Sequence, residues 1–526
     1  MPPKQHSRSL GKQGEANNVM GARTVDDGAA ANSTNPESTQ TMRRSVVSAS
    51  VWATAGFGLG QVLRLGGNII LAAILFQEAF ALMAIASAIL QGLAMFSDLG
   101  LGPSVVQNRR GDERDFLDSA WTLQVIRGVF LTLISFALAW PLASFYAVND
   151  PAAWELRWLL PLVTASTLIQ GFASSKLMSA TRHMNLKRLT SIDLLAQVTS
   201  LTVMITAAWI TKSVYSLAIG NVAGALLHCT LSHVALPGVR NRFRLEPTAV
   251  REIIHFGKWV FLSTLITFFA MQIDKLTFAR MFPLDQVGVY AIAASLAVLT
   301  PTLMGRLQTM IAFPLYARMQ DKEDALQTIV RQSKFPMLTF AGYLVALSIA
   351  GAQSFIDFAY DARYAAAGIY IPILAAGAWF AVIDGIYGAA FLATGRARWV
   401  ALVNGVKVTA FCLLLVPAAH MGGLLGAVVA VAASDFIKLG VALSRARTIG
   451  LRDQFPDAIF TLYTAGAGVG VYWLTMRSTL FEAWPPLALL ATQFVLVTLA
   501  FFPRLLSVAR SVLGARPVVP NPESAA

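Results

Sequence analysis

Polar side chains recur at helical spacing inside four long apolar segments of the chain. Residues three, four or seven positions apart lie on one face of an α-helix. A polar face is costly against lipid, so we expect each to point toward another helix or toward water. A single such face more often joins helices than lines a path, whereas four together indicate a shared central cavity. The four faces carry Thr54, Gln61, Arg64 and Asn68; Ser87, Gln91 and Asp98; Thr264, Thr267 and Asp274; and Ser295, Thr302, Arg306 and Thr309.

Most of the charges expected deep in the apolar segments are basic. At a rise of 1.5 Å per residue, Arg64, Arg306 and Lys407 lie roughly 15–18 Å from a span end, near the middle of a ~30 Å hydrocarbon core. Basic groups bind phosphate, and the alternative is pairing with Asp98, Asp384 or helix carbonyls. We therefore predict an aqueous, anion-binding cavity. The deep bases are Arg64, Arg127, Arg306 and Lys407, and the deep carboxylates are Asp274 and Asp384.

Asp274 and Asp384 are also the candidates for coupling to a proton or cation. The alternative is that each pairs with a nearby base, Lys275 for instance, and serves structure only. The sequence contains no G-x-x-x-x-G-K-[ST] motif, so the energy must come from an ion gradient or from removal of product. His228 and His233 are five residues apart, off a shared helix face and without further ligands, so we predict neither a metal nor a cofactor.

The composition predicts an all-α membrane protein. Hydrophobic residues make up 56% of the 526 residues and charged residues 13%, with a mean hydropathy of +0.59, whereas soluble domains have about 25% charged residues. The net charge of +13 comes from short basic clusters between apolar runs, which suits a membrane and argues against nucleic acid. Cys229 and Cys412 lie inside apolar runs and indicate no disulfide framework.

About fourteen segments between residues 46 and 503 are long enough to cross the membrane. Trp52 and Trp259 are 207 residues apart, as are the Ala-Ile-Ala triplets at 84–86 and 291–293, which suggests a repeat of six spans. An even number of spans makes the two copies parallel, and coincidence in an Ala-rich chain is the alternative. The predicted organisation is a disordered cytoplasmic tail (1–42), two six-helix lobes (43–240 and 241–445), two additional helices (446–503) and a cytoplasmic tail (504–526).

The loop charges predict the orientation in the membrane. Alternate loops contain nineteen Lys and Arg residues, and the intervening loops contain four. By the positive-inside rule, the basic loops and both termini are cytoplasmic. The loops near Asp150, Arg363 and Arg477 are then extracytoplasmic. The cytoplasmic loops surround Arg109, Lys187, Arg242, Lys322, Arg396 and Arg447.

The extracytoplasmic loops are short for an enzyme that works at the membrane surface. The longest, near Ser354 to Arg363, is little more than ten residues and offers only Asp357 and Asp361 as acidic groups. These carboxylates suit a solvated loop end better than catalysis. We therefore predict no catalytic residues.

Several motifs resemble those of the polysaccharide-transporter, or lipid-linked oligosaccharide flippase (Wzx-like), family of the multidrug/oligosaccharidyl-lipid/polysaccharide (MOP) exporter superfamily. The resemblance covers about residues 45–445. It rests on Asp98-Leu99-Gly100-Leu101-Gly102-Pro103, on Arg182-His183-Met184-Asn185-Leu186-Lys187-Arg188, on Asp274-Lys275 with Gly288-Val289-Tyr290-Ala291, and on Phe313-Pro314 with Arg318 and Asp321.

The resemblance implies two six-helix lobes around a cavity lined chiefly by helices one, two, seven and eight, with a lipid pyrophosphate-linked sugar as cargo in a bacterial inner membrane. Membrane lipids and polysaccharide polymerase or export machinery would be its partners. A drug or ion antiporter of the same superfamily is one alternative, and a membrane polysaccharide polymerase or ligase is another. Alanine at Arg64 or Arg306 should then abolish export, and Lys407 should matter less. The predicted cavity residues are Gln61, Arg64, Asn68, Gln91, Arg127, Asp274, Lys275, Arg306 and Lys407.

Overall fold

A computed structural model describes residues 36–97, 101–319, 323–481 and 483–514 of the chain. Most of the predicted tail at 1–42, and also Asp98, Lys322 and Asp321, lie outside the described residues. The described part consists of helices joined by short connections and contains no β-strand. The predicted all-α membrane fold is confirmed.

Within the described residues, eleven helices are long and apolar enough to cross a membrane. They include α1 (Pro36–Ile74), α2 (Gln77–Phe96), α4 (Arg114–Tyr146), α7 (Leu186–Thr211), α8 (Tyr215–Val234), α13 (Glu323–Ala359), α14 (Ala367–Ala393), α16 (Phe455–Arg477) and α17 (Pro486–Gly514). The eighth predicted span is broken into α10 (Leu284–Ala297), α11 (Leu299–Leu307), a π-helical turn (Gln308–Ala312) and α12 (Phe313–Ala317). Two short helices lie between longer ones: α3 (Leu101–Gln107) follows α2, and α6 (Lys176–Arg182) follows α5.

The remaining predicted spans are α5 (Leu156–Gly171), α9 (Pro247–Met281) and the second half of α15 (Ala397–Arg447). α15 is a hairpin of two helices, because Gly422 and Gly423 leave the helical conformation and Gly423 has a φ of +57°. That φ favours glycine, which has no Cβ to clash. With this division the described chain has the fourteen long helices that the sequence predicts.

Two helices extend beyond their predicted limits. α1 begins at Pro36, inside the expected tail, and α17 continues to Gly514, beyond residue 503. The span limits predicted from the sequence mark where the apolar residues end. A helix can continue into water beyond them, since its backbone hydrogen bonds do not depend on lipid. The helices therefore extend past the apolar segments.

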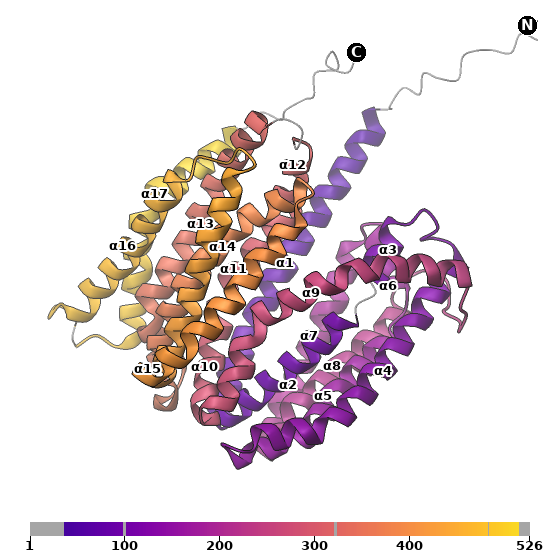
Figure 1. Cartoon of the computed structure of the whole chain (residues 1–526), viewed down its shortest axis with the longest axis horizontal. Helices are drawn as coiled ribbons and strands as arrows, with labels where there is room; N and C mark the ends of the chain where they lie inside the picture. Colours follow the sequence, from indigo (N-terminus) through magenta and orange to yellow (C-terminus); the bar gives the residue numbers. More distant parts are fainter. Residues whose placement is uncertain (1–35, 98–100, 320–322, 482, 515–526) are drawn as a thin grey trace, which may run out of the picture.

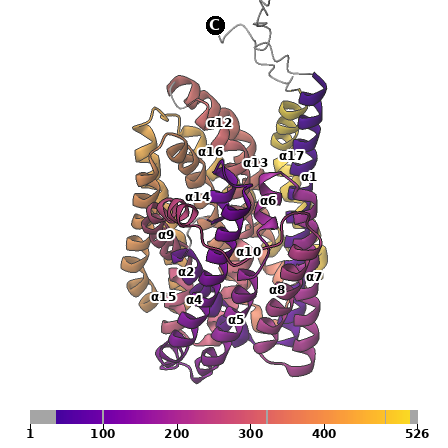
Figure 2. The same cartoon turned by 90° about the vertical axis from the view of Figure 1, so that its right-hand side faces the viewer.

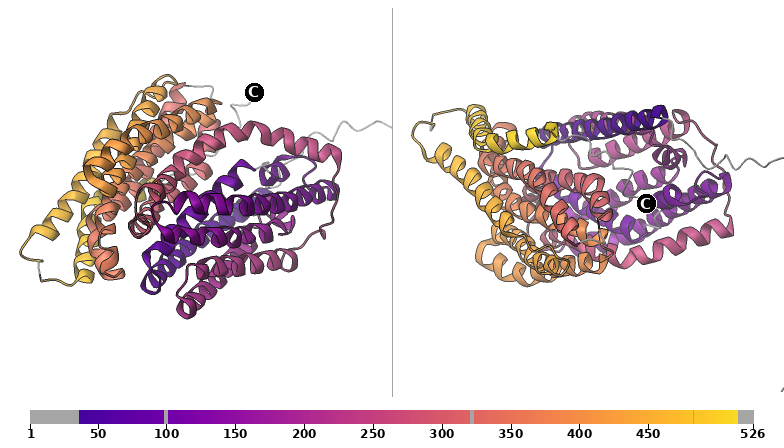
Figure 3. Two further views of the ribbon diagram at one scale, coloured as in Figure 1. Left: turned by 60° about the horizontal axis from the view of Figure 1, so that its bottom comes forward. Right: turned by 90° about the horizontal axis from the view of Figure 1, so that it is seen from above.

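The long helices form two lobes, with α1 to α8 in one and α9 to α15 in the other (Figure 1). Most run roughly parallel, along the vertical of Figure 2, whereas α9 is inclined and passes from the first lobe to the second. α16 and α17 pack on α13, on the side of the second lobe away from the first (Figure 3). The start of α1 and the end of α17 lie at the same end of the molecule, here called the proximal end (Figure 1).

A buried ion pair attaches the last two helices to the second lobe. Lys334 of α13 lies 2.7 Å from the carboxylate of Asp457 on α16, and both side chains are less than a tenth exposed. The Tyr387 hydroxyl on α14 donates to the same carboxylate at 2.5 Å. A buried charge is tolerated when it is paired and hydrogen-bonded, so this cluster holds three helices in register.

Gly220 and Gly224, a GxxxG pair on α8, join two helices of this one chain. A Cβ on Gly220 would lie 2.5 Å from the Cβ of Met204, and one on Gly224 would lie 2.7 Å from that of Ser200, both on α7. Small residues at this spacing allow helix backbones to approach closely. The pair is therefore used within the first lobe.

The lobes meet at the end opposite the proximal end, here called the distal end (Figure 1). Arg363, in the connection between α13 and α14, directs its guanidinium to the carbonyls of Ala72 and Leu75 at the end of α1, at 3.3 and 3.4 Å. Gln77 in turn donates to the Arg363 carbonyl at 2.6 Å. A cation at a helix C-terminus interacts favourably with the helix dipole. The same guanidinium hydrogen-bonds to Asp361 and holds the pKa of that carboxyl below its usual value.

The first lobe caps helix ends of the second lobe in the same way. Asn149, after α4, donates to the carbonyl of Arg280 near the end of α9. Asp150 accepts a hydrogen bond from the Leu284 amide at 3.1 Å, at the start of α10, where a carboxylate satisfies an unpaired N–H group. We call these contacts, together with those of Gln77 and Arg363, the distal closure.

Candidate functional site

A cavity of about 700 Å³ lies between the lobes. The four helical segments predicted from the polar faces all contribute to its wall: α1, α2, α9, and α10 with α11. α14 and both halves of α15 line it as well, whereas from these helices the sequence predicts only Lys407 as a cavity residue. The second lobe therefore supplies more of the cavity than its first two helices.

Arg64 and Lys275 are the cavity cations that lack a carboxylate partner within the described part of the chain. Arg64 is exposed and lines the cavity from α1, with no described carboxylate within 4.0 Å. The Lys275 ammonium on α9 donates to the Gln272 side chain at 2.9 Å, and Gln272 donates to Gln91 of α2 at 2.5 Å. Both positive charges thus remain available to an anion in the cavity.

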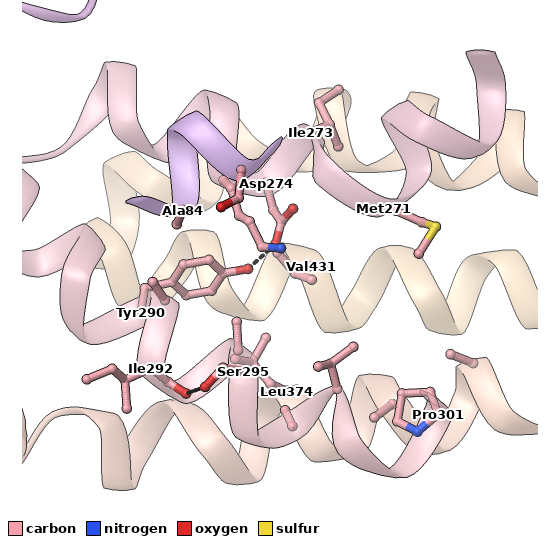
Figure 4. A pocket seen from close by; sticks show the side chains of 18 of the residues that line it. Ala84, Met271, Ile273, Asp274, Tyr290, Ile292, Ser295, Pro301, Leu374 and Val431 are labelled. Carbon is pink, nitrogen blue, oxygen red and sulfur yellow. Dashed lines mark hydrogen bonds between the residues drawn. The ribbon is translucent and has the colours of Figure 1, made fainter. Parts of the chain in front are cut away.

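Asp274 does not pair with its neighbour Lys275. It accepts a hydrogen bond from the buried hydroxyl of Tyr290, and the two side chains face each other from α9 and α10 (Figure 4). Asp274 and Lys275 are successive residues on one helix, so their side chains diverge by about 100°. The pairing with Lys275 that we considered from the sequence is not what the structure shows.

Two ion pairs occupy the wall formed by the second lobe. Lys407, on the first half of α15, lies 2.7 Å from Asp435 on the second half. Lys438 lies 2.8 Å from Asp384 on α14. Four cations line the cavity, Arg64 and Lys275 with these two lysines, against the carboxylates of Asp274 and Asp435, since Asp384 pairs with Lys438 but is not a lining residue. The described lining therefore has an excess of positive charge.

Breaking one of these ion pairs should destabilise the second lobe. Lys407→Met leaves Asp435 charged and only 8% exposed, and removing one partner of a buried pair costs about 3–5 kcal/mol. Because Lys407 is still 18% exposed, we expect the lower end of that range. Thermal melting of the purified protein should show a lower Tm for Lys407→Met, and Lys407→Met/Asp435→Leu should recover most of it. Equal melting of the single variant and the wild type would contradict a stabilising pair.

Other predicted site residues lie in or near this cavity or a second one. Asn68 lines the main cavity. Gln91 and Arg127 line a separate cavity inside the first lobe, where Arg127 donates to the Ala94 carbonyl at 2.6 Å and to the Ser97 hydroxyl at 2.9 Å. The Gln61 side-chain oxygen is buried, without a hydrogen-bond partner among the described residues.

Arg306 is not among the described residues that line the main cavity. Its guanidinium lies 3.9 Å from the centre of the Phe57 ring on α1. The segment from Leu284 to Ala317 has 34 residues, which at 1.5 Å per residue is about 51 Å, well beyond a ~30 Å core. The depth of Arg306 near the middle of the membrane stays a prediction, and the cation–π contact gives its guanidinium a partner on α1.

Sequence reasoning missed Asp435, Lys438 and Asn404. All three lie on α15, where Lys407 was the one cavity residue predicted from the sequence. A spacing signal was present for one pair, since Asp435 and Lys438 are three residues apart on one helical face. Their partners Lys407 and Asp384 lie on other helices, so only the folded chain reveals the pairs.

Comparisons with known proteins agree with this architecture. Residues 70–368 match the family described as Polysaccharide biosynthesis protein. The Lipopolysaccharide biosynthesis protein WzxC of Escherichia coli (strain K12) is 18% identical over 396 residues, which are 73% of this chain and 77% of the relative. The structure of the lipid II flippase MurJ, in an inward closed conformation, superposes with a TM-score of 0.68 at 11% identity, over 88% of this chain and 100% of that one.

An inward-facing multidrug resistance MATE family transporter of the MOP superfamily superposes with a TM-score of 0.60 at 14% identity, over 78% of this chain and 98% of that one. These likenesses show that the chain has the same fold as the two solved structures. The chain belongs to the Polysaccharide biosynthesis protein family, whose match spans more than half of its length. The family resemblance predicted from the motifs is confirmed.

Proposed function

We propose that this protein moves a lipid pyrophosphate-linked oligosaccharide across the bacterial inner membrane, as a step in making O-antigen, capsule or exopolysaccharide. The observation that carries the proposal is the cavity between the lobes, where Arg64 and Lys275 lie without described carboxylate partners. A charge deep in a membrane costs about 2.5–3.5 kcal/mol on insertion scales, and an aqueous cavity that admits a pyrophosphate offsets this cost. Family membership supports the proposed pathway.

The distal closure supports transport by alternating access. The lobes contact each other through capped helix ends there, and capping contacts of this kind can part without unfolding either lobe. We propose that the proximal end, with both chain termini, faces the cytoplasm. The closed distal end then faces outward, and the oligosaccharide enters from the cytoplasmic side.

We propose that the carboxylates of Asp274, Asp384 and Asp435 couple transport to the movement of a proton or cation. A pyrophosphate near Lys407 competes with Asp435 for the ammonium group, and one near Lys438 competes with Asp384. A carboxylate released from its lysine binds a proton more readily, because burial without a partner disfavours its charged form. Substrate binding would then be linked to proton uptake.

The cavity charges favour an anionic cargo over the cationic drugs that an antiporter would export. Asp384 and Asp435 are both engaged by lysines, which leaves Asp274 with its tyrosine as the carboxylate open to a cation. The rival from another class, a polymerase or ligase, would form a glycosidic bond. We propose a transporter, with polymerase and export machinery acting on its product.

A reconstituted assay separates these functions. Purified protein in proteoliposomes, given a polyprenyl-pyrophosphate oligosaccharide in one leaflet, should transfer it to the other leaflet without changing its mass. A product of higher mass would mean an enzyme, and efflux of cationic dyes with no lipid transfer would mean a drug antiporter. The same vesicles with imposed pH or sodium gradients test coupling, since a rate indifferent to both gradients contradicts the proposed role of the carboxylates.

A further inference from the structure

The second cavity, inside the first lobe, differs in chemistry from the main one. It has a volume of about 640 Å³, within the ~300–1,000 Å³ usual for small-ligand sites. Its wall is formed by α2 to α6 and α8. Among the described lining residues the polar groups are mostly amides and hydroxyls, no side chain is acidic, and none is Phe, Tyr or Trp. The polar members are Ser87, Gln91, Gln124, Arg127, Ser166, Thr167, Gln170, Ser174, Asn221 and His228.

The one arginine in this wall is already engaged. Arg127 donates to the carbonyl of Ala94 and to the hydroxyl of Ser97, near the end of α2. Its charge is thus partly satisfied by helix-terminal groups, where a cation is favourable. Compared with the main cavity, which is lined by four cations and two carboxylates, this space offers little to attract an anion.

Several of the neutral polar groups have unused hydrogen-bonding capacity. No hydrogen bond of the Thr167, Gln170 or Asn221 side chains occurs within the described residues, although all three line the space. The Nδ1 atom of His228 is likewise buried without a partner among them. Amide groups both donate and accept, and hydroxyls do the same, which matches the hydroxyl groups of a sugar.

The two cavities adjoin each other, because Met83, Ser87 and Asn221 line both of them. An extended ligand that passes between these side chains would occupy the two at once. We propose that the cavity within the first lobe is the sugar subsite, which holds the neutral glycan while the pyrophosphate lies near Arg64 and Lys275. This inference rests on the proposed function and assigns the glycan to hydrogen bonds, since the described wall offers no Phe, Tyr or Trp ring for stacking.

The test compares two lipids in binding to the purified full-length protein: a polyprenyl pyrophosphate with an attached neutral oligosaccharide, and the same lipid without sugar. Thr167→Val/Gln170→Leu removes hydrogen-bonding groups, with only modest changes in volume, at two residues that line the cavity inside the first lobe and not the main one. We expect it to lose affinity for the glycolipid on the order of tenfold, as loss of two hydrogen bonds produces, with the affinity for the bare lipid unchanged. Gln170→Leu, a single change at an exposed side chain, should act in the same direction.

Thr206→Val on α7 is the matched control, because Thr206 lines neither cavity and hydrogen-bonds to the Thr202 carbonyl. If the wild type binds both lipids equally, or if the cavity variants weaken both equally or neither, the sugar subsite is wrong while the proposed function stands. If the wild type binds neither lipid, the proposed function itself fails.

Discussion

Replacing Arg64 with alanine should abolish transfer of the lipid-linked oligosaccharide while leaving the inserted protein abundant. Arg64 lines the cavity from the first lobe without a described carboxylate partner, so no buried counter-charge is stranded by its removal. A charge-assisted hydrogen bond contributes roughly 1.5–3 kcal/mol, and a guanidinium can make two to a phosphate. Their loss predicts a fall in initial rate on the order of a hundredfold or more in proteoliposomes.

Two further variants make the Arg64 result specific. Arg64→Lys keeps the charge but loses the forked geometry, so we expect partial activity. Arg477→Ala, at the exposed end of α16 and outside the cavity lining, should transport like the wild type. Normal transport by Arg64→Ala would contradict anion binding by the cavity. Among the four deep bases predicted from the sequence, Arg64 is the one for which the structure gives the strongest reason to expect this effect.

Gly288→Val should prevent the distal end from closing. A Cβ on Gly288 of α10 would lie 2.0 Å from the carbonyl oxygen of Gln77 at the start of α2. This neighbour is backbone and cannot turn aside like a long side chain, so the helices must separate. We expect the lobes to part at this end and transport to be lost, because alternating access needs both closures.

Cysteine labelling with an impermeant reagent in intact cells measures this opening. A Ser295→Cys probe in the cavity should react little in the wild-type background and strongly with Gly288→Val. Gly466→Val, where a Cβ meets open space on α16, controls for the substitution itself. A cysteine at Asp150 should react in every background and one at Arg242 in none. Reaction at Arg242 would reverse the proposed orientation, and an unreactive Ser295→Cys with Gly288→Val would contradict the steric argument.

The sequence predicted the helices well because hydrophobic length is a local property. Polar periodicity also identified α1, α2, α9 and α10 as cavity helices, since each polar face had to point inward. It could not identify the partners of Lys407 and Lys438, which depend on how the α15 hairpin folds against α14. The contact of Arg306 with the Phe57 ring shows the same limit, because the two residues lie on different helices.

The distal closure has a consequence for how this protein can change over evolutionary time. Each of its capping contacts joins one side chain to a main-chain group: Arg363 to the carbonyls of Ala72 and Leu75, Asn149 to that of Arg280, and Asp150 to the amide of Leu284. Every residue except proline has both a main-chain N–H group and a main-chain carbonyl. Most substitutions at Ala72, Leu75, Arg280 or Leu284 therefore keep the main-chain group that the contact needs. The positions that cannot change freely are therefore these donor and acceptor side chains together with close-packed positions such as Gly288, and the residues around them can diversify while the distal end still closes.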